Sequence, residues 1–475
     1  MSLEKPVGTI FGHPKGLFLL FGTEMWERFS YYGMRAILVL YLVALTESGG
    51  MGWSNSDALS LYGTYTFLVY VTPLFGGWLA DNLLGQRKSI IIGGLLMAAG
   101  QFTLGVPHEY IISNEMTFFY TGLALLIIGN GMFKPNISTM VGDLYKEGDH
   151  RRDGAFTIFY MGINLGAAIA PLIVGTIAEK FEWQYGFIAA GIGMLMSIIL
   201  QVSLGNKYLG DIGIEPAVKQ SNTKGQAKKE SLTKIEFDRI KVIFIMSAFT
   251  IIFWAGFEQG GGLMNLFASE YTDRWIMNFE VPASWFQSVS AIFIVILAPS
   301  VASCWIKMDH KEPTSPVKFA LALIFLAIGF LFMIGATMQQ GGDITVKTSM
   351  MWLIMAYLFH TLGELCLSPI GLSMVTKLAP LRLASVMMGI WFFFTGMANY
   401  VAGYVGSFIG ESTESANNAM VIFAGIAITA TLSAVIIYLL SDKLVYWMHG
   451  AEGVHQPQKH EGSIIAQQGM STERI

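Results

Sequence analysis

The chain has 475 residues, of which 53% are hydrophobic and only 13% are charged, and its net charge is −4 at pH 7. An ordinary soluble domain carries about 25% charged residues, so this composition argues against a soluble protein and for one embedded in a bilayer. No basic patch is interleaved with aromatic residues, which argues against nucleic-acid binding. The two cysteines, Cys304 and Cys366, lie in separate apolar runs. We therefore expect no disulfide framework, no metal site and no cofactor.

The first apolar run, residues 16–45, is long enough to cross a bilayer but carries a polar stripe. At 3.6 residues per turn this stripe occupies one helical face. It consists of Glu24, Glu27, Arg28, Tyr31, Tyr32 and Arg35. Ionisable groups at membrane depth are costly unless they pair or face water, so they usually mark a transport path. A soluble amphipathic helix is the alternative, and the apolar remainder of the chain disfavours it.

Apolar segments of about 20 residues recur along the chain, and each predicts a transmembrane helix. Six of them lie at 16–45, 58–80, 89–106, 116–140, 155–179 and 184–204. Six more lie at 240–268, 284–306, 317–338, 350–376, 383–409 and 417–441. We therefore expect an all-α integral membrane protein of twelve helices in two bundles, 16–204 and 240–443. The remaining segments would be a cytoplasmic N-terminus at 1–15, a linker at 205–239 and a disordered tail at 444–475.

The basic residues predict the orientation of the chain. Most of the 29 lysines and arginines fall on the termini and on the loops after even-numbered helices. By the positive-inside rule, both termini face the cytoplasm. We expect a multi-pass protein of the cytoplasmic membrane, with the hydrophilic linker as a tether between the bundles.

Two six-helix halves joined by a basic loop match the major facilitator superfamily, in which substrate binds between the halves at the membrane midplane. The loop after the second helix reads Gly77-x-x-x-Asp81-x-x-x-Gly85-x-Arg87-Lys88 and resembles the cytoplasmic loop signature of that superfamily. Asp81 and Arg87 would then form a conformational latch at a neighbouring helix end. A Gly-Asp-Gly turn with basic neighbours is also common on cytoplasmic faces, so this motif alone leaves both interpretations open.

Beyond the first helix, the ionisable residues expected at membrane depth are Lys134, Glu258 and Glu364. With the first helix they make four carboxylates against three cations. Full ionisation would leave one uncompensated negative charge in a poorly solvated site, and such a carboxylate binds a proton readily. One proton would balance the site, as a proton-driven symporter requires.

The same residues suit a ligand that carries both charges. Arg28 and Arg35 suit a carboxylate, and Glu364 suits an ammonium group. Aromatic residues would either form tolerant side-chain pockets or simply pack in the bundle. These are Tyr31, Tyr32, Tyr70, Trp254 and Trp391.

Five motifs, in order along the chain, are similar to signatures of the proton-coupled oligopeptide transporter (POT) family, and the chain resembles a bacterial-type member. The first and fourth helices carry Glu24-x-x-Glu27-Arg28-Phe-x-Tyr31-Tyr32-Gly and Gly-Met-Phe-Lys134-Pro135-Asn136. The fifth carries Phe159-Tyr160-Met-Gly-Ile-Asn164-Leu-Gly166-x-x-x-x-Pro171. The seventh and tenth carry Trp254-x-x-x-Glu258-Gln259 and Gly363-Glu364-x-x-x-Ser368-Pro369.

The resemblance implies roles for these residues. Protonation would be coupled to movement by Glu24, Glu27, Arg28 and Lys134, with Lys134 able to pair with one of those glutamates or with Glu364. Arg35 and Glu258 would form a salt bridge between the halves that closes an extracellular gate. The peptide carboxylate end and backbone would be held by Arg28, Tyr32, Lys134 and Asn164, and the amino terminus by Glu364. Side-chain pockets would include Tyr31, Tyr70, Trp254 and Trp391, with Ser368 beside them.

The sequence departs from the family pattern in three places. The linker is too short and polar for the extra two-helix hairpin of many bacterial members. The eighth helix reads Gln287-Ser288-Val-Ser290-Ala291 where members commonly have an Asn-Pro pair. The second helix has no histidine, so proton coupling would rest on carboxylates. His360 is either an accessory to that coupling or a buried, hydrogen-bonded histidine.

The leading hypothesis is a monomeric symporter that imports di- and tripeptides with protons across the cytoplasmic membrane. An alternative is the same machine with a non-peptide substrate, such as nitrate or a small organic metabolite. An intramembrane hydrolase is disfavoured because His360-x-x-x-Glu364 has no second histidine nearby, so we expect no enzyme. A sensor without flux would be separated from a transporter by measuring coupled uptake.

Overall fold

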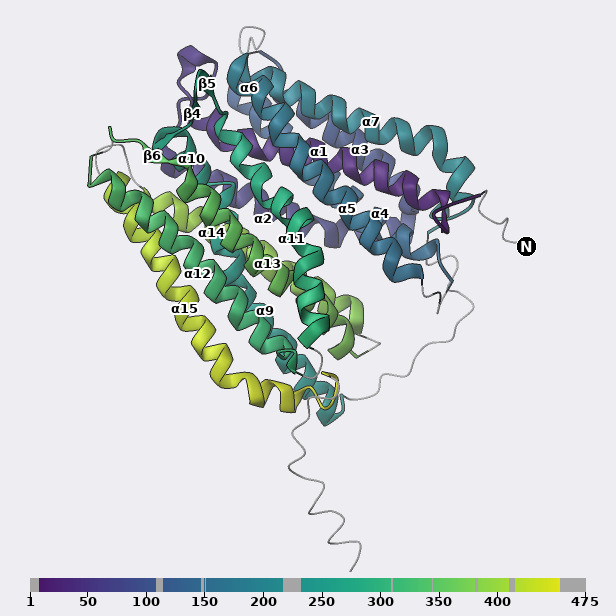
Figure 1. The fold of residues 1–475 in the computed structure, drawn as a ribbon. Coiled ribbons are helices and arrows are strands. Elements are labelled where there is room, and N and C mark those ends of the chain that lie inside the picture. Colours follow the sequence, from purple (N-terminus) through teal and green to yellow (C-terminus); the bar gives the residue numbers. More distant parts are fainter. Residues whose placement is uncertain are drawn as a thin grey trace, which may run out of the picture.

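The structure, a computed structural model, describes residues 8–107, 114–146, 149, 151–216, 232–308, 311–343, 345–380, 383–409 and 415–452. Within these ranges the chain is predominantly α-helical (Figure 1). Part of the predicted linker, 217–231, and most of the predicted tail, 453–475, lie outside the described residues.

The long helices of the first half follow the predicted segments closely. They are α1 (Lys15–Val43), α2 (Asn55–Leu79), α3 (Gln86–Leu104), α4 (Glu115–Asp143), α5 (Arg151–Ala170) and α7 (Trp183–Leu209). The predicted fifth segment is interrupted: α5 ends where Pro171 begins a π-helical turn, η4 (Pro171–Gly175), which leads into the short helix α6 (Thr176–Lys180). A proline inside a helix removes one backbone hydrogen bond, which accounts for the irregular turn.

The second half contains α9 (Lys234–Phe257), α11 (Phe286–Met308), α12 (Ser315–Gln340), α13 (Met350–Leu378), α14 (Ala384–Gly406) and α15 (Ser415–Trp447). The predicted segment 240–268 breaks after α9 into a 3-10 turn, η5 (Glu258–Gly260), and a short helix, α10 (Leu263–Glu270). Three consecutive glycines, at 260–262, account for this break because glycine is a poor helix former.

The helices on either side of the predicted linker extend into it. α7 continues to Leu209, and α9 already begins at Lys234. The start of α9 is fixed by a capping box, in which the Thr233 side chain accepts from the Glu236 backbone and the Glu236 side chain accepts from the Thr233 backbone.

Short strands are confined to the ends of the helices. β1 (Thr9–Ile10) and β2 (His13–Pro14) form an antiparallel pair before α1. β4 (Trp275–Ile276) and β5 (Phe279–Glu280) form another after α10, and β3 (Thr272–Asp273) runs parallel to β6 (Thr348–Ser349).

Ten helical segments of the described chain are long and apolar enough to span a membrane. The two long helices outside that group are α1 and α3. α1 carries Glu24, Glu27, Arg28 and Arg35, and α3 has only 19 residues and begins at Gln86-Arg87-Lys88. Length and hydropathy alone therefore support a multi-pass membrane protein.

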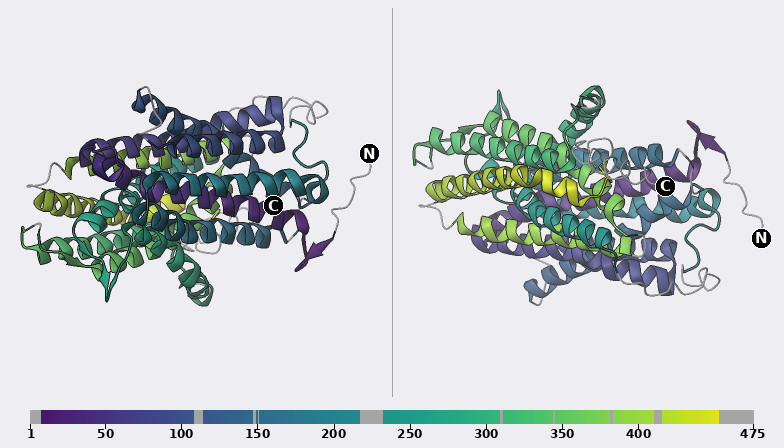
Figure 2. Two further views of the ribbon diagram at one scale, coloured as in Figure 1. Left: turned by 90° about the horizontal axis from the view of Figure 1, so that it is seen from above. Right: turned by 90° about the horizontal axis from the view of Figure 1, so that it is seen from below.

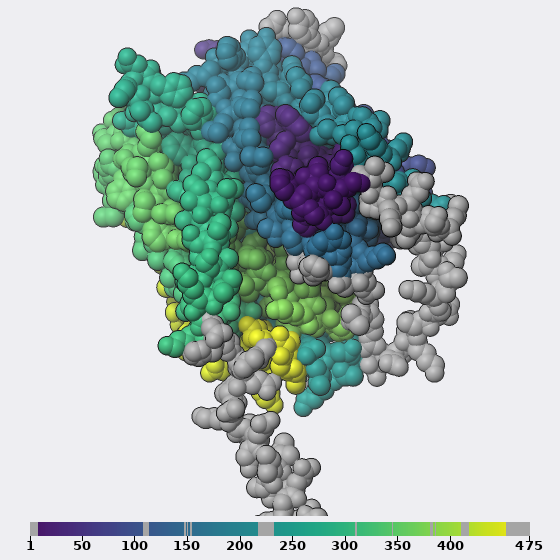
Figure 3. Space-filling view, turned by 45° about the vertical axis from the view of Figure 1, so that its right-hand side comes forward, coloured from purple at the N-terminus to yellow at the C-terminus, as the bar shows by residue number. Residues whose placement is uncertain are grey.

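The helices form two groups that meet at one end of the molecule. In Figures 1 and 2 the first half (purple to blue) and the second half (green to yellow) come together at the end that carries α6, α10 and β4. The contacts between halves run mainly between α2 and α14 and between α5 and α11, and Figure 3 shows α11 beside the first half. The cavity described below lies between these two groups of helices.

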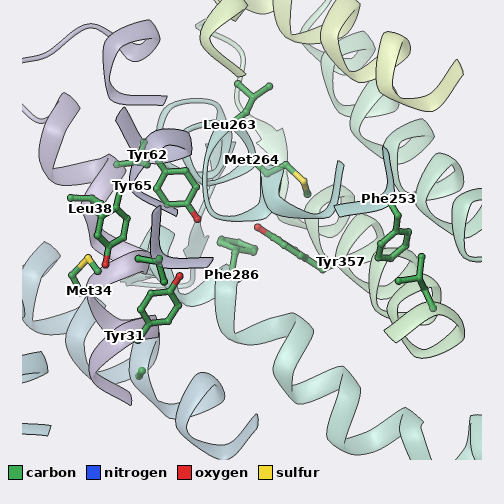
Figure 4. Close-up of a cluster of buried hydrophobic side chains, with 14 of the residues drawn as sticks. Tyr31, Met34, Leu38, Tyr62, Tyr65, Phe253, Leu263, Met264, Phe286 and Tyr357 are labelled. Carbon is green, nitrogen blue, oxygen red and sulfur yellow. The ribbon is translucent and has the colours of Figure 1, made fainter. Parts of the chain in front are cut away.

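A continuous buried core joins the halves near this end. Figure 4 shows Tyr62 of α2 on the side of Met264 of α10, with Phe286 and Tyr357 close by, whereas Tyr65 of α2 points toward α1. All five side chains are at most 4% exposed. The core therefore packs residues from both halves against one another.

A pair of glycines forms a close contact between α2 and α14. A Cβ atom added to Gly403 would lie 2.4 Å from the Gly63 Cα, a distance at which backbones must move apart. Small residues at such crossings let membrane helices pack closely.

We predict that Gly403→Ala lowers the melting temperature of the detergent-solubilised protein, because overpacking a tight contact costs about 1–3 kcal/mol. Gly425→Ala is the matched control, since an added Cβ there meets no atom within 4 Å. Equal melting temperatures for the two variants would contradict the assignment of Gly403 as a tight contact between halves.

Candidate functional site

A cavity of about 260 Å³ lies between the two halves. Its wall includes ten of the residues that the sequence singled out for substrate binding: Tyr32, Arg35, Tyr70, Lys134, Asn164, Trp254, Glu258, Glu364, Ser368 and Trp391. They come from α1, α2, α4 and α5 on one side and from α9, η5, α13 and α14 on the other. Residues far apart in the sequence thus converge on one space.

Arg28 and Tyr31 do not line the cavity, although the sequence suggested both for substrate binding. Arg28 Nε lies 2.8 Å from Glu24 Oε1 and 2.6 Å from Glu27 Oε2, and the three side chains are at most 4% exposed. Arg28 is held away from the cavity because it forms ion pairs with two carboxylates of its own helix. Tyr31 is buried beside Tyr32, with ring centroids 5.3 Å apart.

This cluster of Arg28, Glu24 and Glu27 also contacts α4. The side-chain amide of Asn130 donates a hydrogen bond to Glu27 Oε1, at 3.2 Å. The cluster carries two negative charges against one positive charge when all three groups are ionised. An excess negative charge therefore lies behind the wall of the cavity.

Lys134 faces the cavity without a carboxylate partner among the described residues. Its ammonium nitrogen lies 4.1 Å from the centroid of the Tyr70 ring, a cation–π contact. The predicted pairing of Lys134 with a glutamate is absent from this conformation. Pro135, the next residue, has no N–H to donate to the Gly131 carbonyl oxygen. A Cβ atom added to Gly76 of α2 would lie 2.0 Å from that oxygen, so α2 packs closely against α4 there.

Arg35 and Glu258 form an ion pair that joins α1 to η5. The Arg35 Nε also donates a hydrogen bond to the Tyr62 hydroxyl, at 2.5 Å. Gly261 packs against this group so closely that an added Cβ would lie 2.0 Å from the Tyr62 hydroxyl oxygen. The glycine run that breaks the helix is thus also what lets the two halves close around Arg35.

One face of α13 supplies the opposite wall of the cavity. His360, Glu364 and Ser368 follow one another at intervals of four residues and all line the space. No cation of the described chain lies within ion-pair distance of Glu364. His360 is 1% exposed and packs on the Phe330 ring, with centroids 4.7 Å apart.

The cavity also contains residues to which the sequence analysis gave no role in binding. They are Tyr160, Gln287, Ser290, Tyr357 and Thr395. Tyr160 lies four residues before Asn164, whose side chain donates to the Tyr160 carbonyl at 2.9 Å, so helical spacing was a usable signal. Gln287 and Ser290 lie in the stretch where family members commonly have an Asn-Pro pair, which was a usable signal. For Tyr357 and Thr395 only their position in apolar helices was visible.

The two residues of the suggested latch make separate contacts. Arg87 donates to the Gly210 carbonyl at 2.8 Å and to Asn206 Oδ1 at 2.9 Å, so it ties α3 to the end of α7. Asp81 lies in the π-helical turn η2 (Ala80–Leu84) and is exposed. No ion pair joins the two within the described chain.

The site contains two clusters in which an arginine is paired with glutamates, which we call closed. It also contains two ionisable residues that have no ion-pair partner among the described residues, which we call open charges. Arg28 and Arg35 are paired with glutamates, whereas Lys134 and Glu364, when ionised, present opposite charges from opposite halves. A cavity with one free cation and one free anion is complementary to a molecule that carries both charges.

Comparison with known proteins places the chain in a family. A model described as the POT family matches residues 87–224 and 200–422. An uncharacterized transporter of Bacillus subtilis, YclF, is 36% identical over 94% of this chain and 97% of its own length. The peptide transporter YePEPT of Yersinia enterocolitica is 34% identical over 95% of this chain and 99% of its own. A crystal structure of a peptide transporter POT in complex with sulfate superimposes with a TM-score of 0.86, at 33% identity, over 95% of this chain and 100% of the other.

The resemblance stated from the five motifs is therefore confirmed. The family is one of transporters, and the relatives match over nearly the whole chain. Taken together, the two-group helical fold, the charged cavity between the groups and these matches show that the chain belongs to the POT family.

Proposed function

We propose that this protein is a symporter that imports di- and tripeptides together with protons. The observation that carries the proposal is the pair of open charges, Lys134 on α4 and Glu364 on α13, which face one cavity from opposite halves. A peptide with free termini carries a carboxylate and an ammonium group, so it can bind one charge of each half. The relative YePEPT, named a peptide transporter, supports the same substrate class.

In this proposal the peptide carboxylate binds Lys134, and the ammonium group binds Glu364. Tyr32, Tyr70 and Asn164 contact the carboxylate end and the backbone. Trp254, Trp391 and Ser368 surround the remaining space, where aromatic faces accept side chains of varied shape. The wall is rich in rings and poor in further charges, which favours recognition of the termini over recognition of any one side chain.

The ion pair between Arg35 and Glu258 is the proposed gate on the extracellular side. It joins α1 of the first half to η5 of the second, so the two halves separate there only if the pair breaks. A proton on Glu258 removes its negative charge and weakens its hold on Arg35. Peptide and proton together would then let the halves rock between two arrangements around the cavity.

The excess negative charge of Glu24, Glu27 and Arg28 provides a second place for a proton. These side chains are buried, and Asn130 of α4 binds Glu27. A change of charge there would alter the field at Lys134, which the cluster faces from the neighbouring helix. We infer that binding of the peptide carboxylate and binding of a proton are coupled through this cluster.

The proposed membrane arrangement has twelve spans. α1 and α3 would span with the ten helices that meet the length and hydropathy criterion, because the charges of α1 are paired or face the cavity. The extra hairpin of many bacterial members would be absent. Both termini would face the cytoplasm, and the protein would work as a monomer in the cytoplasmic membrane, with Asp81 and Arg87 acting at the cytoplasmic ends of the helices.

The proposal is tested by uptake of labelled dialanine into proteoliposomes. We expect accumulation when the lumen is alkaline and negative relative to the outside, and loss of accumulation when a protonophore is added. Peptide-independent proton flow, or uptake that ignores the proton gradient, would contradict symport. Protein that is folded but moves no peptide would contradict the substrate class.

Glu364→Gln should weaken transport of dialanine about tenfold or more, because a charge-assisted contact to the ammonium group is lost. Transport of amino-acetylated dialanine, which has no ammonium group, should be weak in both proteins and change little. Competition against labelled substrate measures both effects. Equal losses for the two peptides would show that Glu364 does not bind the amino terminus.

Glu258→Gln should abolish accumulation driven by a proton gradient while leaving counterflow exchange of peptide measurable. The amide keeps the size of the side chain but cannot change its charge by binding a proton. Glu280→Gln is the control, since Glu280 pairs with Arg274 and Lys180 near the surface and lies outside the cavity. Unimpaired accumulation in Glu258→Gln would show that Glu258 is not part of the gate.

A further inference from the structure

The end of the molecule where the halves meet contains a second contact, centred on Glu179 at the end of α6. Its carboxylate accepts hydrogen bonds from the backbone N–H groups of Ala283, at 2.8 Å, and Ser284, at 2.9 Å. It also accepts one from the Ser284 hydroxyl, at 2.5 Å. These donors belong to η6 (Ala283–Trp285), which leads directly into α11.

Glu179 therefore caps a helix of the opposite half. The first N–H groups of a helix have no partner within it, and the side chain of a Ser, Thr, Asp or Asn just before the helix commonly accepts a hydrogen bond from one of them. Here the preceding residue is Pro282, which supplies no side-chain cap. The cap comes instead from Glu179, more than a hundred residues earlier in the chain.

Neighbouring groups hold the same contact. Trp285 donates from its indole nitrogen to the Thr176 hydroxyl, at 2.8 Å. Arg274 lies 3.8 Å from Glu179 and adds a positive charge beside the carboxylate. The backbone at Gly175 approaches so closely that an added Cβ would lie 1.9 Å from the Ser284 hydroxyl oxygen. The surfaces of η4, α6 and η6 are thus fitted to each other.

The contact is connected to the region of the gate. At the second residue of α11, the Gln287 side chain donates to the backbone carbonyl of Ala36, at 3.4 Å. Ala36 follows Arg35, the residue that pairs with Glu258. The side chain of Asn265 in α10 donates to the same carbonyl, at 2.9 Å. Holding the start of α11 in place therefore also holds a donor against α1 beside Arg35.

We propose that Glu179 is a positioning residue for the conformational cycle, and that its cap on α11 is a second lock on the end closed by Arg35 and Glu258. The inference rests on the proposed alternating-access transport. When this end opens, α11 must leave Glu179, and four polar partners of one carboxylate are given up together. Its role differs from that of the gate because Glu179 lies outside the cavity and contacts no substrate.

The test measures the distance between the halves by pulsed electron spin resonance in nanodiscs. Spin labels would be placed at Ser48 in the first half and Met277 in the second, both exposed near this end, after Cys304 and Cys366 are replaced by alanine. Glu179→Ala should raise the ratio of open to closed molecules about tenfold. Glu179→Gln, which keeps one accepting oxygen, should give an intermediate shift.

Lys180→Gln is the matched control, because the contacts of the adjacent Lys180 with Glu280, at 3.5 Å, and with the Phe279 ring, at 5.7 Å, are half-exposed, and exposed ion pairs contribute little free energy. Its distance distribution should equal that of the parent. Ser284→Ala and Thr176→Val each remove one side-chain hydrogen bond between the halves, and Thr176→Val also removes one to the Leu172 carbonyl of its own half. Both should shift the distribution in the same direction as Glu179→Ala, by less. These milder variants keep the test valid if Glu179→Ala does not fold.

Transport of dialanine separates this inference from the proposed function. A parent protein that transports, with Glu179 variants whose distances do not change, would overturn the lock alone. A parent that moves no peptide would overturn the proposed substrate, whereas the distances would still report whether Glu179 holds the halves together. A merely structural role for Glu179 would lower the melting temperature without altering the distance distribution.

Discussion

The cost of placing ionised groups at membrane depth is the constraint on which this structure depends. A buried charge must have a partner, or must face a space that water or a ligand can enter. This chain meets the requirement in both ways. Arg28 lies between Glu24 and Glu27, and Arg35 is paired with Glu258, so both guanidinium charges have partners within the protein. Lys134 and Glu364 have no such partner within the described chain and face the cavity.

The same constraint links binding to movement. One closed pair, Arg35 with Glu258, joins the two halves, and the open charges lie on opposite halves. In the proposed cycle, a ligand that satisfies both open charges would draw the halves together at the cavity. A proton that neutralises a closed pair would release them at the end of the molecule. The polar contacts around Glu179 add resistance at that end, so its opening would depend on more than one broken interaction.

Much of this could be predicted from the sequence because helical periodicity and hydropathy are local signals. The positions of the long helices followed from hydropathy. Ten residues of the cavity wall were predicted, among them Lys134 and Glu364, whose charge is unexpected in apolar segments. Pro171 and the glycines at 260–262 could be read in the sequence, but the sequence did not predict that they interrupt their helices. Their effect depends on the helices packed around them.

The sequence did not show which side chains contact one another. Arg28 was expected at the substrate, but two carboxylates of its own helix hold it in the core. Lys134 was expected beside a glutamate, but it lies over the Tyr70 ring in this conformation. Glu179 carried no signal at all, because an ordinary glutamate near the end of a helix reveals its partners only when a distant segment packs against it. Contacts between halves depend on tertiary structure, which local patterns do not encode.

The most direct test of the central claim is an experimental structure of the protein with bound dialanine. The account predicts that the peptide lies in the cavity with its carboxylate within ion-pair distance of the Lys134 ammonium group and its amino terminus within ion-pair distance of Glu364. A peptide bound in the reverse orientation, or bound away from both residues, would contradict the proposal that these two open charges define the substrate.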